Sequence, residues 1–291
     1  MTRKIFVDDD LIDNLILKSL PPEYEVLLND ESLDSDEEEY FYLILLILSG
    51  QINEAKKWLH SDEFKRISKD IENVPLNFFD DLELKLRVYV QDKFELLLAP
   101  LISIFYEYAN EQAYKSLNKI PTMTDNDLLR FLRLKQYNYH ILSNLCVDLN
   151  KNFKDIIFED IMNGKDVKDM EEDIENSGVD PINKHTAQQR AKMIAQTEVN
   201  NIKQNSKIQA YIDNDIHWVD IITKGDGKVC SICLDAESNN PYPIEEADGM
   251  IPFHPRCRCE YGASKENFDN NPYLTERFNE MIDEEIGEYF Y

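Results

Sequence analysis

Apolar residues recur at helical spacing through the first half of the chain. Glu38–Ser49 is mostly apolar, which predicts a buried helix closed by Gly50, and Ile52–Leu59 predicts a second helix after it. Asp80–Asn118 predicts one long helical stretch that bends at Pro100, because proline removes a hydrogen bond from a helix interior. Glycine is scarce in this half, which argues against a turn-rich β domain.

Further helices are predicted on either side of this stretch. Thr124 is the expected N-cap of a helix that runs to Met162 and ends at Asn163-Gly164. Shorter or more polar helices are predicted at Asp8–Leu17, at Lys165–Asn176 with Gly178 as its stop, and at His185–Ile212. The acid-rich segment Asp30–Glu39 predicts a solvated loop in preference to a cation site.

The pattern changes after these helices. His217–Thr223 contains several β-branched residues and predicts a strand, and a second strand is expected beside His254–Cys259. We therefore predict an α+β protein that is predominantly α-helical. Its expected regions are an acidic helical region at 1–163, a small mixed module with a short β-sheet at 164–262, and an acidic helical tail at 263–291.

Charge is distributed unevenly along the chain. The formal net charge is −26, yet Ile182–Gly262 contains nine basic and eleven acidic residues, so the flanks carry most of the acidity. This balance argues against strong direct binding of duplex DNA, because phosphate binding needs clustered Lys and Arg. The longest apolar run, Tyr40–Leu48, is too short to cross a bilayer, and no secretory signal is visible. We expect a soluble protein, made in a cytoplasm, with no membrane partner.

Four of the five cysteines cluster near one histidine. Cys230 and Cys233 form a C-x-x-C pair, and His254, Cys257 and Cys259 follow after a loop. This pattern predicts a structural Zn²⁺ site, because zinc prefers tetrahedral sulfur and nitrogen ligands. Five candidates exist for four positions: Cys230 and Cys233 lead, Cys257 follows, and His254 and Cys259 compete for the fourth. A redox pair, a disulfide or plain thiols are the alternatives.

A second group of residues lies upstream of the cysteines. Arg190, Ile194 and Thr197 share one face of a predicted helix, with Glu198 beside it. An exposed helix face with an ion pair accounts for this spacing without any special function. The remaining cysteine, Cys146, lies in an apolar helical pattern and is predicted to be a core residue.

Taken together, these two groups resemble the phage Mu F-like minor head proteins. The matching residues occur in the family's order, over about Gly164–Gly262: Arg190, Ile194-Ala195, Thr197-Glu198, Trp218, Asp226, Cys230, Cys233, His254-Pro255 and Cys257-Arg258-Cys259. The chain departs from the family pattern at Gln196, where arginine is usual, and at Arg256, where asparagine is usual.

The resemblance implies a non-enzymatic function. It implies a structural minor head protein of a tailed virus or prophage, associated with the portal vertex and acting in head morphogenesis or DNA delivery. Its expected partners are the portal protein and other head or scaffold proteins, and its expected location is the virion, in the capsid interior or at the portal vertex. The alternatives are a zinc-supported nuclease or toxin-like enzyme, which no basic patch near the cysteines supports, and a zinc-knuckle adaptor that binds other proteins.

Overall fold

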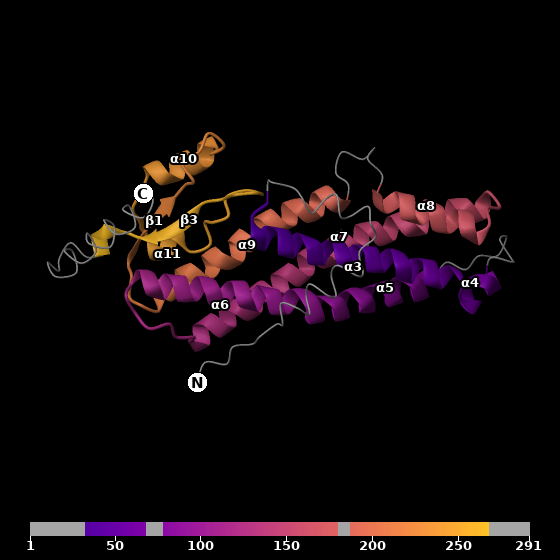
Figure 1. Cartoon of the computed structure of the whole chain (residues 1–291), viewed down its shortest axis with the longest axis horizontal. Coiled ribbons are helices and arrows are strands. Elements are labelled where there is room, and N and C mark those ends of the chain that lie inside the picture. The colour runs from indigo at the N-terminus through magenta and orange to yellow at the C-terminus, as the bar shows by residue number, and fades with distance from the viewer. Residues whose placement is uncertain (1–32, 68–77, 180–186, 268–291) are drawn as a thin grey trace. The chain divides into compact units, whose positions relative to one another are not determined.

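A computed structural model of the chain describes residues 33–67, 78–179 and 187–267 (Figure 1). Helices make up most of these residues, and a three-stranded antiparallel sheet accompanies them. The prediction of a predominantly helical α+β protein is thereby confirmed. The helices predicted at Asp8–Leu17 and in the acidic tail after residue 267 lie outside the described residues.

Contacts divide the described residues into two compact units. The first unit takes residues up to Ile104 together with Arg133–Val199, and the second takes Phe105–Leu132 together with residues from Asn200 onward. The limits of these units fall inside three long helices, so each of these helices supplies residues to both units. The three regions 1–163, 164–262 and 263–291 remain a prediction from sequence patterning.

Helix α3, Ser35–Leu59, belongs to the first unit and corrects two predictions. Asp34 caps it, since its side chain accepts from the Glu37 backbone N–H at 2.8 Å while Glu37 reaches back to the Asp34 N–H. The acids of residues 35–39 therefore form the first turns of a helix, where they complement the helix dipole, rather than a solvated loop. The predicted break at Gly50 is also wrong, because α3 continues through it.

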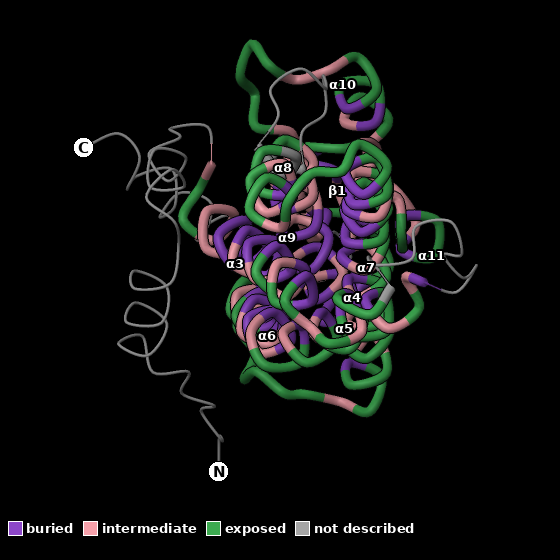
Figure 2. Tube along the Cα trace, turned by 90° about the vertical axis from the view of Figure 1, so that its right-hand side faces the viewer, coloured by how far each residue is buried: buried purple, intermediate pink, exposed green. Residues whose placement is uncertain are grey.

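Much of helix α3 is buried, as the purple segments in Figure 2 show. Tyr40–Leu45 are all buried in sequence, so packing covers the helix on every side and not along one stripe. Near its end, Trp58 packs against Phe64 and Phe78, with ring centroids 5.3 and 5.4 Å apart. This aromatic group anchors the short helix α4, Asp62–Ile67, to α3.

Gly50 is required by a neighbouring tyrosine rather than by a turn. A Cβ atom at this position would lie 1.6 Å from the Tyr89 hydroxyl oxygen and 2.4 Å from the ring carbon that bears it. We expect Gly50→Ala to destabilise the protein by about 1–3 kcal/mol, because Tyr89 must move. In a Tyr89→Ala background the same change should instead stabilise α3 by about 0.5–1 kcal/mol, since alanine favours helix. Urea unfolding of the four proteins tests this reversal of sign.

A π-helical turn precedes Pro100, the residue at which the sequence predicts a bend. Helix α5, Asp80–Lys93, leads into π-helix η2, Phe94–Leu98, and then into α6, Ala99–Ser116. The Ala99 N–H donates to the Phe94 carbonyl, which is the i to i−5 pattern of a π-helix. This wider turn comes just before the proline, the residue that has no N–H to donate.

Three further helices follow the predictions closely. Helix α7, Asp125–Met162, begins after Thr124, whose hydroxyl accepts from the Asp127 N–H at 3.1 Å. It ends at Gly164, where φ is +69° and the Lys165 N–H bonds back to the Asp160 carbonyl. Helix α9 spans Ala187–Ile212, and helix α8, Val167–Val179, continues through Gly178, so the stop predicted there is wrong.

The sheet belongs to the second unit. Strand β1, Trp218–Ile222, is central, with β2, Tyr242–Pro243, on one side and β3, Glu260–Ala263, on the other. The strand predicted at His217–Thr223 is therefore confirmed. Helix α10, Ser231–Ser238, helix α11, Ile244–Ala247, and the short 3₁₀ turn η3, Lys265–Asn267, complete this part. Its core joins buried Val219 and Ile221 to the buried cysteines.

No helix among the described residues is long and apolar enough to cross a membrane.

Candidate metal centre

The C-x-x-C pair lies at the start of helix α10. Cys230 has extended backbone geometry and occupies the N-cap position, while Cys233 lies in the first turn. This change from extended to helical backbone turns both side chains to the same side, and their sulfur atoms lie 3.5 Å apart. The local backbone therefore places two thiol groups where both could bind the same metal ion, and we call this pair the two-thiol grip.

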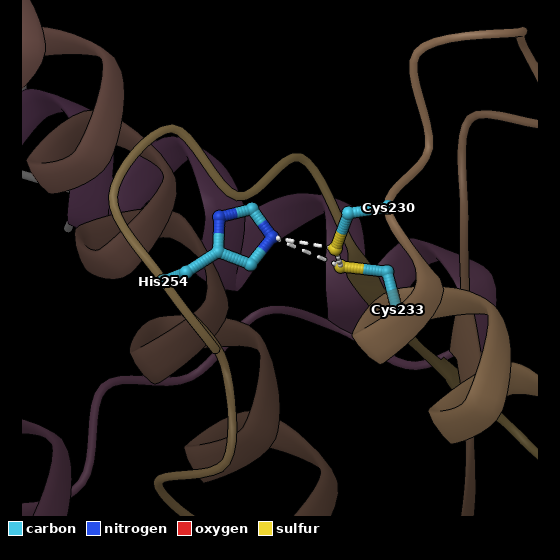
Figure 3. Close-up of side chains that lie close together, drawn as sticks. All are labelled: Cys230, Cys233 and His254. Carbon is cyan, nitrogen blue, oxygen red and sulfur yellow. Dashed lines mark hydrogen bonds between the residues drawn. The ribbon is translucent and has the colours of Figure 1, made fainter.

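His254 points its imidazole at both sulfur atoms (Figure 3). Its Nε2 atom lies 3.1 Å from Cys230 Sγ and 3.3 Å from Cys233 Sγ. Its Nδ1 atom lies 2.8 Å from the Pro255 carbonyl oxygen, so a proton on Nδ1 donated there leaves Nε2 as the ligand atom. In this orientation His254 could serve as a metal ligand together with the two thiols.

Cys257 and Cys259, which follow His254 in the sequence, lie beside the same cluster. Cys257 Sγ lies 4.0 Å from Cys233 Sγ. The ligand atoms of Cys230, Cys233 and His254 lie within 4.8 Å of one another, and so do those of Cys233, Cys257 and Cys259. All five predicted residues are thus brought together, and Cys233 belongs to both groups. Since His254 joins the first group directly, Cys257 and Cys259 are left as the competitors for a fourth position.

Burial and mutual hydrogen bonds give the four cysteine thiols different pKa values. Burial raises the pKa of Cys233 to about 12, whereas the hydrogen bond from Cys259 lowers the pKa of Cys257 to about 5. The same hydrogen bond raises the pKa of Cys259, and the Cys233 backbone N–H lowers that of Cys230. The cluster therefore contains both thiolates and protonated thiols, and a bound cation would displace the protons of the protonated thiols. These residues can hold a metal ion.

Helix α9 holds the backbone of the second ligand segment. The Asn200 side-chain amide donates to the carbonyls of Cys257 and Cys259, at 2.9 and 3.1 Å. One turn later, the Gln204 side-chain oxygen accepts from the Tyr261 N–H at 2.9 Å, and its amide donates to Asn200. Sequence reasoning missed both residues, although their i, i+4 spacing on the helix before the cysteines places them on one face.

Loss of this support should weaken metal binding. We expect Asn200→Ala to lower metal affinity about 10- to 100-fold, because groups that orient a ligand segment have effects of that size. Asn239→Ala is the matched control, since Asn239 is exposed and donates to the Asp235 carbonyl within α10. Competition of each purified protein with a chromophoric chelator measures the affinities. Equal affinities for the two variants would contradict a supporting role for Asn200.

A second contact links the two chain segments that carry the candidate metal ligands. Arg258 Nη1 and Nη2 donate to the two carboxylate oxygens of Asp226, at 2.7 and 2.8 Å. This bidentate pair joins the turn before Cys230 to the residue between Cys257 and Cys259. Arg258 holds the pKa of the Asp226 carboxyl down at about 2. Both residues belong to the motif on which the family resemblance rests.

The upstream residues of that motif lie in the first unit. Arg190 Nη1 pairs with Asp148 of α7 at 2.5 Å, a partner on another helix that the spacing within α9 did not predict. The Thr197 hydroxyl donates to the Met193 carbonyl within α9, and Glu198 is buried. In the second unit Trp218 is partly exposed on β1, and its backbone is held by the Asn267 side chain.

A pocket opens beside the cysteine cluster. Its lining includes Lys224, Lys228, Arg256 and Arg258 together with the ligand candidates Cys230 and His254. The sequence contains no run of basic residues here, but the fold brings these four together from two segments. Two of the four are paired with carboxylates, Lys224 with Glu260 and Arg258 with Asp226.

Comparison of the chain with protein-family models, with curated proteins and with solved structures found no match.

Proposed function

We propose that this chain is a structural minor head protein of a tailed virus or prophage, of the phage Mu F-like kind, with a zinc-stabilised module. The observation that carries the proposal is the concentration of motif residues in one place. Asp226 pairs with Arg258, and Cys230, Cys233, His254, Cys257 and Cys259 gather beside that pair. Seven of the residues behind the resemblance thus lie together in the second unit.

Zinc is the proposed metal because of the donor set and its spacing. Sulfur atoms about 2.3 Å and a nitrogen atom about 2.0 Å from a tetrahedral zinc ion lie about 3.5–3.8 Å apart. The separations among Cys230, Cys233 and His254 range from 3.1 to 3.5 Å, so small adjustments suffice for these three donors, and Cys257 Sγ lies 4.0 Å from Cys233 Sγ. Calcium and magnesium are disfavoured, since they prefer oxygen ligands.

A structural role suits this site better than a catalytic one. Catalytic zinc keeps a coordination position open for water, whereas two groups of three donors that share Cys233 offer five candidate ligands here. Cys233, Cys257 and Cys259 are also buried in the core of the second unit, so the ion would replace packing that a small module lacks. The acidic remainder of the chain would dock on portal or scaffold surfaces through complementary charge.

The metal and its ligands are tested on the intact protein. Elemental analysis of protein purified without added metal should find about one zinc per chain. Substitution with Co²⁺ should give the absorption bands of a tetrahedral site, with a thiolate charge-transfer band. Thiol labelling should modify Cys230, Cys233, Cys257 and Cys259 only after chelation. Zinc-free protein with a disulfide between any of these cysteines would contradict the metal proposal.

The viral role is tested by counting the protein in particles. Quantitative mass spectrometry should be applied to purified procapsids and mature particles of the virus or induced prophage that encodes the chain. A few copies per portal ring are expected in at least one of the two particle types. Absence from both, with the protein present in the lysate, would contradict the role and favour an adaptor function.

A further inference from the structure

Cys230 differs from the other clustered cysteines in its exposure. Cys233, Cys257 and Cys259 are buried in the core of the second unit, whereas Cys230 is only partly buried. Three of the four cysteines line the pocket beside the cluster, namely Cys230, Cys233 and Cys259, and Cys230 has the largest exposed fraction of these three. Since cysteine reactivity depends on access, a small solute in the pocket reaches the sulfur atom of Cys230 most readily.

Cys233 supplies a second thiol within reach of Cys230. Their sulfur atoms lie 3.5 Å apart, and both side chains leave the start of helix α10 on the same side. The bonded sulfur atoms of a disulfide are about 2.05 Å apart, so rotation about the side-chain bonds has only a short gap to close. Cys257 Sγ lies farther from Cys233 Sγ, at 4.0 Å, and Cys257 is fully buried. The geometry therefore favours pairing of Cys230 with Cys233.

The cluster offers one more donor than a tetrahedral ion needs. Five candidate ligands gather here for four positions: Cys230, Cys233, His254, Cys257 and Cys259. Without Cys230 four candidates remain, but without both Cys230 and Cys233 only three remain. A disulfide between these two cysteines therefore takes the donor set below the number that zinc requires, whereas loss of Cys230 alone does not.

Release of the ion would affect the core of the second unit. That core contains Cys233, Cys257 and Cys259 together with Val219 and Ile221 of β1. An ion bound there links the start of α10 to the segment that precedes β3, and small folds depend on such links. Loss of the ion should therefore loosen the sheet-containing part of the second unit, so that oxidation and folding are coupled.

We propose that Cys230 is a site of reversible oxidation by hydrogen peroxide, which joins it to Cys233 in a disulfide and releases the zinc ion. The partial exposure of Cys230 makes its sulfur atom the point of attack, and the nearness of Cys233 provides the second thiol. A partly exposed disulfide is open to reduction by small dithiols, which makes the change reversible. The proposal rests on the zinc site of the proposed function and not on the viral role.

The oxidation proceeds in two balanced steps. Zinc keeps the Cys230 sulfur as a thiolate, which attacks one peroxide oxygen; the O–O bond breaks, a sulfenic acid forms and hydroxide leaves. The Cys233 thiolate then attacks the Cys230 sulfur, the S–O bond breaks and a second hydroxide leaves. Two protons from solvent convert the hydroxides to water. The two sulfur atoms lose two electrons and the peroxide gains them, and the zinc ion dissociates.

The test is treatment of the reduced, zinc-loaded full chain with hydrogen peroxide. A chromophoric chelator measures the released zinc, and peptide mapping under non-reducing conditions locates the disulfide. One zinc ion should be released for each Cys230–Cys233 disulfide formed, and dithiothreitol with added zinc should restore the starting protein. Retention of zinc and thiols, release of zinc without a disulfide, or a disulfide between other cysteines overturns the proposal.

Matched variants separate the reactive cysteine from the spare donor. Cys230→Ser and Cys259→Ser each leave four candidate ligands, so both should retain about one zinc per chain. Cys230→Ser should release zinc under peroxide more slowly by about tenfold or more, because it lacks the accessible thiolate, whereas Cys259→Ser should release it as the unaltered protein does. Equal release rates for the two variants overturn the proposal. If either variant does not retain zinc, the disulfide map of the unaltered protein decides.

Every sample is purified with dithiothreitol, which is removed before oxidation, and its zinc content is measured at that point. Reduced protein without zinc contradicts the metal proposal and, with it, the release step. Protein that contains zinc and keeps it under peroxide contradicts the redox proposal alone. The two failures are therefore distinguishable.

Discussion

Replacement of Cys233 by serine is expected to remove the metal and unfold the sheet-containing part of the second unit. Cys233 is the one cysteine shared by both donor groups, and it is buried among the core residues of that unit. Structural zinc contributes about 10–16 kcal/mol of apparent binding free energy in small zinc-dependent folds, so the loss should exceed that of any single packing change in this unit. Zinc per chain should fall from about one to near zero.

Limited proteolysis with mass spectrometry locates this unfolding. New cleavage sites should appear within residues 213–267, while the buried helix α3 remains protected. Cys146→Ala is the matched control, because Cys146 is equally buried but lies alone in the first unit. Its zinc content should stay at about one. Unchanged zinc content and unchanged cleavage in Cys233→Ser would contradict a structural metal at this cluster.

The second large effect is expected at Asp127, a fully buried carboxylate near the start of α7. It accepts from the Tyr106 hydroxyl at 3.1 Å, the Asn110 amide at 3.2 Å and the Thr124 N–H at 3.0 Å. Burial raises its pKa, and the nearby Asp213 carboxylate adds to that rise. Asp127 therefore serves as the common acceptor that holds α6 residues against the α7 N-cap.

Asp127→Ala should lower the free energy of unfolding by about 3–5 kcal/mol, because it leaves several donors without an acceptor. Asp125→Ala is the control: Asp125 lies in the same first turn but is exposed, so its loss should change stability by no more than about 0.5 kcal/mol. Chemical denaturation of both variants gives the comparison. A loss below about 1 kcal/mol for Asp127→Ala would show that the network contributes little.

The residue pattern predicted most of the secondary structure for identifiable reasons. The Thr124 cap, the Asn163-Gly164 end and the strand at His217–Thr223 are local features, decided by residues a few positions apart. The predicted break at Gly50 failed because a local rule was applied to a tertiary effect. That glycine makes room for Tyr89, a residue on another helix, and so it interrupts nothing.

The cysteine cluster also combines features that the sequence predicts with features that only the fold decides. The two-thiol grip of Cys230 and Cys233 follows from their spacing, and the involvement of His254, Cys257 and Cys259 follows from their chemistry. The residues that compete for the fourth ligand position cannot be inferred from spacing or chemistry. Sequence spacing made His254 and Cys259 the competitors for the fourth position, whereas the fold aims His254 at the first two sulfur atoms and leaves Cys257 and Cys259 to compete.

The sequence by itself determined the helical class of this protein, the strand that begins the mixed module and the candidate metal-ligating side chains. Only the tertiary structure decided the Asn200 clamp, the Asp226–Arg258 pair and the basic pocket. Periodicity, capping and ligand chemistry depend on residue types at short spacing. Contacts across tens of residues depend instead on how the elements pack, and packing is set by the shapes of all the side chains together.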